Sequence, residues 1–385
     1  MKKIVVILLA AVLLFGAVYP AFAIPTPPPP GATPPPPPPT DYTSQALRFV
    51  HSTFPDPNPV NNPMLDTIVD SINGANEVVF MTIYSISDPA IIQALKDAHD
   101  RDVTVLLFCE SDNRFMVQEL IDYGIPTRCD TQPNYLMHMK VLITDNQTIV
   151  STGNWTKSAT RQQDNMLAVF DDLSVTVLFK WMFLDMYNPG GDYARSGYQR
   201  NIRGCYPMTI DGARAQRLVI CFGPGTHMED TYEELWANWA ATSSPTEVWA
   251  AEYWVTHPTL PNVFGDLAAS GVPVYLSTDE RGYESGDQTY GAFCTGGVEL
   301  RVMDDDTYYS LAIEHMKAGA GLGLYGRLGY FGSSNLTNYG QLYNDDLRIF
   351  IIDDPIVNRM AKVLAYRWGW MNDNMSKGFA YDGCP

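Results

Sequence analysis

The chain has 385 residues, of which 46% are hydrophobic and 12% aromatic, enough for one large or two ordinary packed domains. Its formal net charge of −18 at pH 7 repels polyanions at long range. This disfavours a general nucleic-acid binder, which needs a basic surface, but it allows a local basic pocket within an acidic shell.

The N-terminus has the features of an export signal. Lys2 and Lys3 precede an apolar run over 4–18, and Ala-Phe-Ala at 21–23 fits the rule for signal-peptidase cleavage. We therefore expect a signal peptide of the Sec type over 1–23 and a secreted or periplasmic protein. An uncleaved membrane anchor is the alternative, although the apolar run is shorter than a bilayer span requires.

A proline-rich segment follows, with 11 of the chain's 28 prolines in residues 25–39. Such a composition predicts an extended polyproline-type linker, assigned to 24–41, with a ligand for a polyproline-binding domain as the alternative. The rest of the chain repeats itself, which predicts two halves at 42–200 and 201–385.

Each half alternates apolar strands with amphipathic helices. The first half is expected to form a strand at 77–84, a helix at 89–98 capped by Asp88, a strand at 103–108 and a closing helix at 175–187. The second is expected to form a strand at 247–253, a helix at 258–269, a strand at 272–276 and a closing helix at 355–371. This alternation predicts an α/β fold whose mixed or mostly parallel sheets are covered on both faces.

Six cysteines form an even set, which suits an exported chain. Six cysteines allow 15 pairings, and the absence of C-x-x-C spacing argues against a zinc site. Our expected pairing is Cys109–Cys129, Cys205–Cys221 and Cys294–Cys384, with buried free thiols as the alternative.

A histidine–lysine pair occurs twice, and each copy is followed by an asparagine-bearing turn. The first copy contains His138, Lys140, Asp145 and Asn154, and the second contains His315, Lys317 and Asn335. Imidazoles, ammonium groups and carboxamides together can supply the nucleophile, proton donor and hydrogen-bond donors that cleavage of a phosphodiester needs.

These motifs resemble those of the phospholipase D superfamily, whose pattern is H-x-K, four residues, Asp, six residues and G-S-x-N. The resemblance covers about residues 45–375. It implies two similar α/β/α sandwich halves related by a pseudo-twofold axis, with one active site at their interface. It also implies cleavage through a phosphohistidine, with no metal and no cofactor.

By this resemblance His138 is the nucleophile and His315 the general acid, although the sequence alone cannot order two near-equivalent repeats. The lysines Lys140 and Lys317 are expected to bind the non-bridging oxygens, and Asn154 and Asn335 to donate further hydrogen bonds.

Each histidine also needs a partner for its second ring nitrogen. Family members place a carboxylate about ten residues after the asparagine. Asp164 and Asp346 stand at these places, with Asp345 as a substitute for Asp346. A solvated loop acid is the alternative interpretation of each.

The second motif departs from the family pattern. His138 and Asn154 are 16 positions apart, one fewer than usual, whereas His315 and Asn335 are 20 apart. The excess falls in the glycine-rich run 318–326, so Asp145, expected to support the site, has no counterpart. We expect weakened activity and a more mobile segment there.

Several other residues are weaker candidates. His227 is expected to be structural or at the surface, with a place near the cleft, which the resemblance implies, as the alternative. Tyr135, Tyr308 and Tyr309 are expected at the pocket mouth or in the core. Asp304 to Asp306 are expected in a solvated loop, with cation binding as the alternative. Trp236, Trp239, Trp249 and Trp254 are expected in the core of the second half.

The sequence therefore predicts an exported, metal-independent phosphodiesterase that hydrolyses or transfers phosphatidyl groups. Export, acidity and the lack of a basic cluster favour a phospholipid substrate. We also expect transient contact with a membrane surface and a monomer. A secreted nuclease with the same site is the rival enzyme, although the acidity disfavours nucleic acid as a partner. A degenerate, non-catalytic binding protein is the rival outside enzymes.

Overall fold

The computed structural model describes residues 41–44, 46–52, 61–130, 135–187, 203–210, 216–257, 259, 262–285, 287–303, 313–374 and 380–384. The expected signal peptide, nearly all of the linker and the boundary at 200–201 lie outside these residues. So do Asp304 to Asp306, Tyr308 and Tyr309. Within the described ranges, no helix combines the length and apolar character needed to cross a bilayer.

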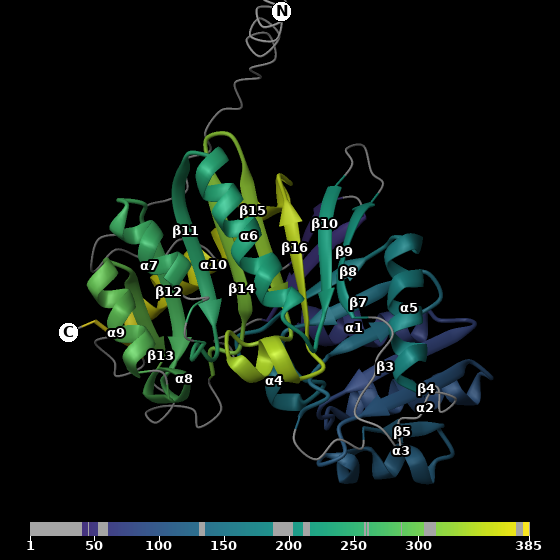
Figure 1. Ribbon diagram of the computed structural model, residues 1–385. Coiled ribbons are helices and arrows are strands. Elements are labelled where there is room, and N and C mark those ends of the chain that lie inside the picture. The colour runs from purple at the N-terminus through teal and green to yellow at the C-terminus, as the bar shows by residue number, and fades with distance from the viewer. Residues whose placement is uncertain are drawn as a thin grey trace, which may run out of the picture.

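The described residues form two mixed sheets (Figure 1). The first sheet has eight strands: β1 (Asp41–Ser44), β2 (Leu47–His51), β3 (Val78–Ile83), β4 (Thr104–Cys109), β5 (Thr127–Cys129), β6 (Val141–Ile143), β7 (Thr148–Ser151) and β8 (Met166–Phe170). The second has nine: β9 (Gly204–Ile210), β10 (Gln216–Phe222), β11 (Pro245–Glu252), β12 (Val274–Asp279), β13 (Glu299–Met303), β14 (Lys317–Gly323), β15 (Arg327–Gly332), β16 (Leu347–Ile352) and β17 (Ala380–Asp382).

The two sheets repeat one strand order. The first runs β1-β2-β8-β7-β6-β3-β4-β5, and the second runs β9-β10-β16-β15-β14-β11-β12-β13 and adds β17 at its edge. In both, three successive strands are parallel (β3, β4 and β5; β11, β12 and β13), and the other pairs are antiparallel. The predicted α/β class, the internal repeat and the mixed sheets are confirmed.

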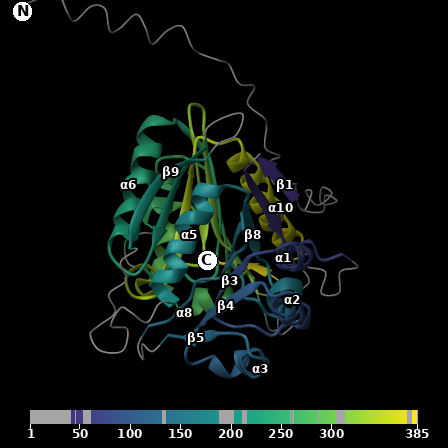
Figure 2. The same ribbon diagram turned by 90° about the vertical axis from the view of Figure 1, so that its right-hand side faces the viewer.

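Helices cover both faces of each sheet (Figures 1 and 2). Those of the first half are α1 (Pro63–Asn73), α2 (Pro89–Asp100), α3 (Gln118–Asp122), α4 (Lys157–Arg161) and α5 (Leu173–Tyr187), with a 3₁₀ turn at Arg114–Val117. Those of the second are α6 (His227–Thr242), α7 (Asn262–Ala269), α8 (Glu280–Ser285), α9 (Asp287–Gly296) and α10 (Ile356–Asn374), with a π-helical turn at Tyr339–Tyr343.

The helix starts follow from local sequence. The Asp88 side chain accepts a hydrogen bond from the Ala90 N–H, and Pro89 occupies the first turn of α2, as predicted. Asn62 caps α1 in the same way, with Pro63 in its first turn. The closing helices α5 and α10 lie where the sequence placed them, within a few residues at each end.

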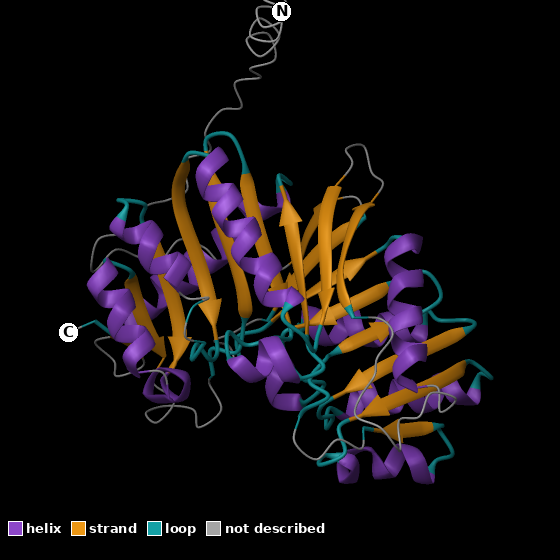
Figure 3. Cartoon of the chain, viewed as in Figure 1, coloured by secondary structure: helices purple, strands orange, loops and turns teal. Residues whose placement is uncertain are grey.

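One hydrophobic core joins the two halves. It includes apolar side chains from both sheets and from α5 and α10. The rings of Phe49 and Phe331 meet edge to face at 5.1 Å, and those of Phe179 and Phe222 do so at 5.2 Å. The two halves are therefore packed as one body, and their loops gather where the sheets meet (Figure 3).

Three disulfides fasten the edges of the halves. Cys109–Cys129 joins β4 to β5, Cys205–Cys221 joins β9 to β10, and Cys294–Cys384 ties α9 to the C-terminal segment. The expected pairing is confirmed. The first two disulfides each join two neighbouring strands.

Candidate active site

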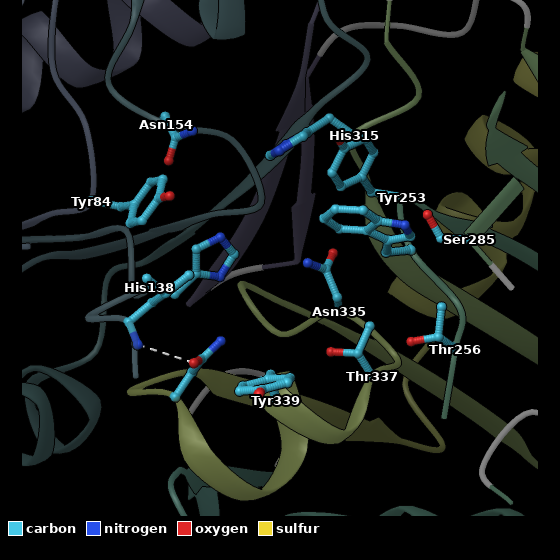
Figure 4. A pocket seen from close by; sticks show the side chains of 13 residues that line it. Tyr84, His138, Asn154, Tyr253, Thr256, Ser285, His315, Asn335, Thr337 and Tyr339 are labelled. Atoms are coloured by element: carbon cyan, nitrogen blue, oxygen red, sulfur yellow. Dashed lines mark hydrogen bonds between the residues drawn. The ribbon is translucent and has the colours of Figure 1, made fainter. Parts of the chain in front are cut away.

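Both motif histidines face one cavity of about 550 Å³ between the halves (Figure 4). His138 comes shortly before β6 and His315 shortly before β14, at the edge where the loops gather. Asn154 follows β7 and Asn335 follows β15, and both side chains also line the cavity. The fold therefore brings together four predicted residues that are far apart in the sequence.

The halves exchange backbone hydrogen bonds directly beneath the histidines. The His138 N–H donates to the Asp345 carbonyl at 2.9 Å, and the His315 N–H donates to the Asp164 carbonyl at 3.1 Å. These matching bridges place each histidine against the residues that precede a strand of the opposite half, β16 for His138 and β8 for His315. The position of each imidazole is thus fixed by the interface.

His138 is paired with a carboxylate across the interface. Its Nδ1 lies 2.9 Å from Asp346 Oδ1, which also accepts a 2.6 Å hydrogen bond from the Ser333 hydroxyl. Burial opposes ionisation of Asp346, but His138, Lys140 and Ser333 together lower the pKa of this carboxyl. An ionised carboxylate accepts, so Nδ1–H of His138 donates and Nε2 is left for chemistry.

His315 has a neutral partner instead. Its Nδ1 lies 3.0 Å from Asn165 Oδ1, which also accepts from the Thr152 hydroxyl at 3.1 Å. Asn165 Nδ2 donates to the Ala159 carbonyl at 3.0 Å, so the amide cannot be turned round without losing that bond. The Nδ1–H of His315 therefore donates as well, and its Nε2 is the reactive nitrogen.

Both lysines are fully buried behind the histidines. Lys140 Nζ donates to the His138 carbonyl, and Lys317 Nζ donates to the His315 carbonyl at 2.7 Å. Burial lowers the pKa of Lys317 to about 7, and burial together with the Lys317 charge lowers that of Lys140 well below its usual value. A bound anion would favour their charged forms.

Each motif histidine also packs against a tyrosine ring of its own half. Tyr84, just after β3, meets the His138 ring edge-on at 5.0 Å, and Tyr253, just after β11, lies 4.8 Å from the His315 ring. Each lysine Nζ sits 5.1 Å from the centre of the tyrosine ring in its own half. These contacts are the same in the two halves, which makes the histidine partners the main difference between them.

Comparisons with known proteins point to the same family as the sequence motifs. The family model described as "Cardiolipin synthase, PLD-like domain" matches residues 68–186. A mitochondrial cardiolipin hydrolase of Xenopus laevis is 27% identical over 135 residues, which is 33% of this chain and 62% of that protein. A phospholipase D of Rickettsia bellii is 31% identical over 122 residues, which is 30% of this chain and 60% of that protein. These matches support the phospholipase D superfamily as the family of this chain.

The sequence matches reach about three fifths of the length of these two relatives. Solved structures extend the likeness in fold to both halves. A phosphatidylserine synthase of Haemophilus influenzae has a TM-score of 0.59 at 12% identity, over 89% of each chain. A polyphosphate kinase of Porphyromonas gingivalis has a TM-score of 0.56 at 13% identity, over 87% of this chain and 48% of that one.

Two predicted superfamily residues lie elsewhere. Asp164 was expected to hold one of the motif histidines, but its buried carboxylate points to Arg367 Nε at 3.3 Å and to the Ser52 hydroxyl at 3.2 Å. Asp145 accepts backbone N–H groups from residues 76–78 at the start of β3, and it does not line the cavity. Neither carboxylate contacts a motif histidine.

The residue that sequence reasoning missed is Asn165. Asn165 stands eleven positions after Asn154, and Asp346 stands eleven positions after Asn335. Asp164 is at ten, which is one residue out of register, and a one-residue shift before a strand turns the side chain to the other face. Equal spacing in the two repeats was the signal that could have found it.

Among the weaker candidates, one tryptophan lies where it was not expected. Trp236, Trp239 and Trp249 are buried as predicted, but Trp254 lines the cavity. His227 is not a lining residue, and its Nε2 lies 2.6 Å from the Phe222 carbonyl oxygen. Tyr135 stacks on Tyr343 at 5.3 Å.

The chemistry available in the cavity is therefore nucleophilic and acid–base. In the part of the chain that is described, no group of three or more His, Cys, Asp or Glu side chains is placed to hold a metal ion. Among the described residues that line the cavity, none is lysine or arginine. Two reactive imidazole nitrogens with fixed tautomers are what the site offers to a substrate.

Proposed function

We propose that this protein is an exported phosphodiesterase of the phospholipase D type that hydrolyses or transfers phosphatidyl groups through a phosphohistidine. The observation that carries the proposal is the pair of imidazoles, each held through Nδ1 by a partner from the opposite half, at one cavity. A positioned nucleophile and a positioned proton donor are the two groups that this displacement needs.

The lysines and asparagines support the same reaction. Asn154 and Asn335 line the cavity with the histidines, and Lys140 and Lys317 are buried directly behind them. Buried donors of this kind typically stabilise a transition state by about 3–4 kcal/mol each. The retention of all four, with both histidines, argues against a degenerate binding protein.

A phospholipid substrate is favoured over nucleic acid. The chain carries a net charge of −18, and the described cavity lining contains neither lysine nor arginine. A nuclease needs cationic contacts that track a polyanionic backbone. Mature protein with its disulfides formed would be expected to meet its substrate at a membrane surface.

The test uses phosphatidylcholine, EDTA and dilute ethanol. Wild-type protein should form phosphatidylethanol, because a covalent phosphatidyl-enzyme can pass its group to an alcohol. His138→Ala should form none, and His99→Ala, half-buried on α2 and not among the residues that line the cavity, should behave as wild type. Loss of activity in EDTA that a divalent metal restores would contradict the metal-independent mechanism.

A further inference from the structure

The two motifs also differ in the side chain that stands beside the lysine. Glu252, the last residue of β11, is directly opposite Lys317 in the pairing of β11 with β14, and both are fully buried. Residues that are opposite each other in an antiparallel pair have neighbouring side chains on one face. Glu252 precedes Tyr253, and the residue that precedes Tyr84 in the first half is Ile83, which packs in an apolar cluster.

An arginine accompanies this acid. Arg348 of β16 is buried, and its guanidinium lies 4.9 Å from the centre of the Tyr330 ring. The Tyr330 hydroxyl donates to Glu252 Oε1 at 2.8 Å. Arg348 Nη2 donates to the Ser334 carbonyl at 2.7 Å, just before the cavity-lining Asn335. The network therefore extends from the buried acid to the turn that carries the cavity asparagine.

The fold itself does not require these polar groups. Counted from the motif asparagines, Arg348 corresponds to Leu167 and Tyr330 corresponds to Ile149. Both first-half residues are buried in the same apolar cluster as Ile83, on strands with the same places in the sheet. Burying charges is costly, and apolar residues of similar volume are often equally stable or more stable. The reason for the charges in the second half is therefore to be sought at the site.

We propose that Glu252 is a positioning residue whose charge favours the protonated form of Lys317, ready to bind the phosphate. Arg348 and Tyr330 hold the acid in its ionised form. This inference rests on the proposed function. Because Lys140 has Ile83 at the corresponding place, the two motif lysines differ in how firmly they hold a proton before the substrate arrives.

The electrostatics of the pair agree with this role. Burial lowers the pKa of Lys317 to about 7, and the charge of Glu252 is the largest effect that opposes this shift. Burial raises the pKa of Glu252 to about 7, whereas the charge of Arg348 and the Tyr330 hydroxyl lower it. Both groups therefore exchange protons near neutral pH, where a small change in one alters the charge of the other.

Other titratable groups also act on this pair. Smaller effects in the same direction on Lys317 come from three acids, Asp346, Glu314 and Asp279. The neighbouring bases are Lys140, His138 and His315, and the neighbouring tyrosines are Tyr232, Tyr253 and Tyr290. Of all these groups, Glu252 is the one paired with Lys317 across β11 and β14.

Sulfate binding tests this role without turnover. Sulfate resembles a phosphate group, does not change its own charge near neutral pH, and can be titrated by calorimetry. For the wild type, affinity should fall as the pH rises through about 7, because Lys317 loses its proton. In Glu252→Gln the fall should begin at lower pH, which makes affinity roughly 10-fold weaker at about pH 8. Glu247→Gln, near the other end of β11, should follow the wild type.

A double-mutant cycle shows whether Glu252 acts through Lys317. In a Lys317→Met background, Glu252→Gln should not weaken sulfate binding, because the proton that it governs is gone. Tyr330→Phe removes only the hydroxyl that donates to Glu252, and it should shift the pH dependence in the same direction by a smaller amount. This variant keeps the role testable if thermal melting shows that Glu252→Gln is unfolded.

Turnover of phosphatidylcholine gives an independent readout. The pH profile of kcat/KM reports the free enzyme, and that of kcat reports the complex. In Glu252→Gln the high-pH limb of kcat/KM should move to lower pH. The limb of kcat should move less, because a bound phosphate itself favours the charged form of Lys317. A loss of kcat that is equal at every pH would show that Glu252 is only structural.

The outcomes separate this inference from the proposed function. An unchanged pH dependence of sulfate binding in both Glu252→Gln and Tyr330→Phe would overturn the inference alone, and so would equal weakening in the Lys317→Met background. A wild type that binds sulfate as expected, responds to Glu252→Gln and yet does not cleave phosphatidylcholine would overturn the proposed function. The control of Lys317 by Glu252 would then still stand.

Discussion

The hairpins that carry the two motifs differ in length but not in the site they build. In the first, pairing along β6 and β7 ends at Ile143–Thr148, and in the second, pairing along β14 and β15 ends at Leu322–Arg327. The second hairpin is longer by two residues on each strand, and the turns have the same length. Because side chains alternate along a strand, adding two residues to each strand keeps every motif side chain on its original face.

This comparison explains the irregular spacing of the second motif. The four additional residues lie at the far end of the hairpin from His315. Asp145 lies in the corresponding turn of the first hairpin, where it holds the start of β3. Its missing counterpart therefore takes nothing from the cavity, and the expectation of weakened activity loses its structural basis.

The glycines of the second hairpin are also explained by packing. A Cβ on Gly319 would lie 2.3 Å from the ring of Tyr330, and one on Gly321 would lie 2.8 Å from the ring of Trp239. Both residues belong to a strand paired on both sides. Residues 318–323 of this run therefore form a strand fitted against large aromatic rings, and 324–326 form the turn that follows it.

The largest effect on stability is expected from the loss of the cation that pairs with a buried carboxylate of the first half. Asp164 and Asp345 occupy matching bridges, and Asp164 lies against Arg367 of α10. Arg367→Met should lower the free energy of unfolding by about 3–5 kcal/mol, because it leaves a buried carboxyl group without its cation. Urea unfolding would measure this.

The control for Arg367→Met is Arg359→Met, on the exposed face of the same helix. It should change stability by less than about 0.5 kcal/mol. Equal effects of the two substitutions would show that the buried ion pair has no special weight.

Next in size is the effect of removing the buried cations on turnover. Lys140→Met and Lys317→Met keep the shape of the side chain and remove its charge. Each should lower kcat by about 10²–10³-fold, as is typical for loss of one preorganised donor. A large loss for one lysine and none for the other would show that the two halves do not share the phosphate equally.

How much of this could be read from the sequence depends on the range of the interaction. The fold class, the repeat and the closing helices follow from local patterns and chain order. The partner of His315 does not, because Asn165 and Asp164 differ by one position and only the register of β8 decides which side chain turns inward. Arg367 is 203 positions from Asp164 in the sequence. Their ion pair depends on how α10 packs across the interface between the halves.

The free energy of unfolding should depend on pH because Lys317 is buried. Burial lowers the pKa of Lys317 to about 7 from the usual 10.5 of an exposed lysine. Between these values the unfolded chain binds the proton and the folded chain does not, so stability should rise with pH from about 7 to about 10.5. The free energy of unfolding of Lys317→Met should rise less over this range, because only the lowered pKa of Lys140 then contributes. Parallel curves for the wild type and the variant would contradict the shift.

The smallest effect is expected for Asp145, the motif aspartate without a counterpart. Its carboxylate accepts three backbone N–H groups, at 2.8, 3.0 and 2.8 Å, and these bonds lower its pKa although burial alone would raise it. Asp145→Ala should therefore cost about 1–2 kcal/mol of stability and leave kcat within a factor of about three. Asp145→Asn should recover part of the stability, since an amide oxygen can still accept. A large fall in kcat with unchanged stability would mean that the turn communicates with His138, and the two hairpins would then differ in function as well as in length.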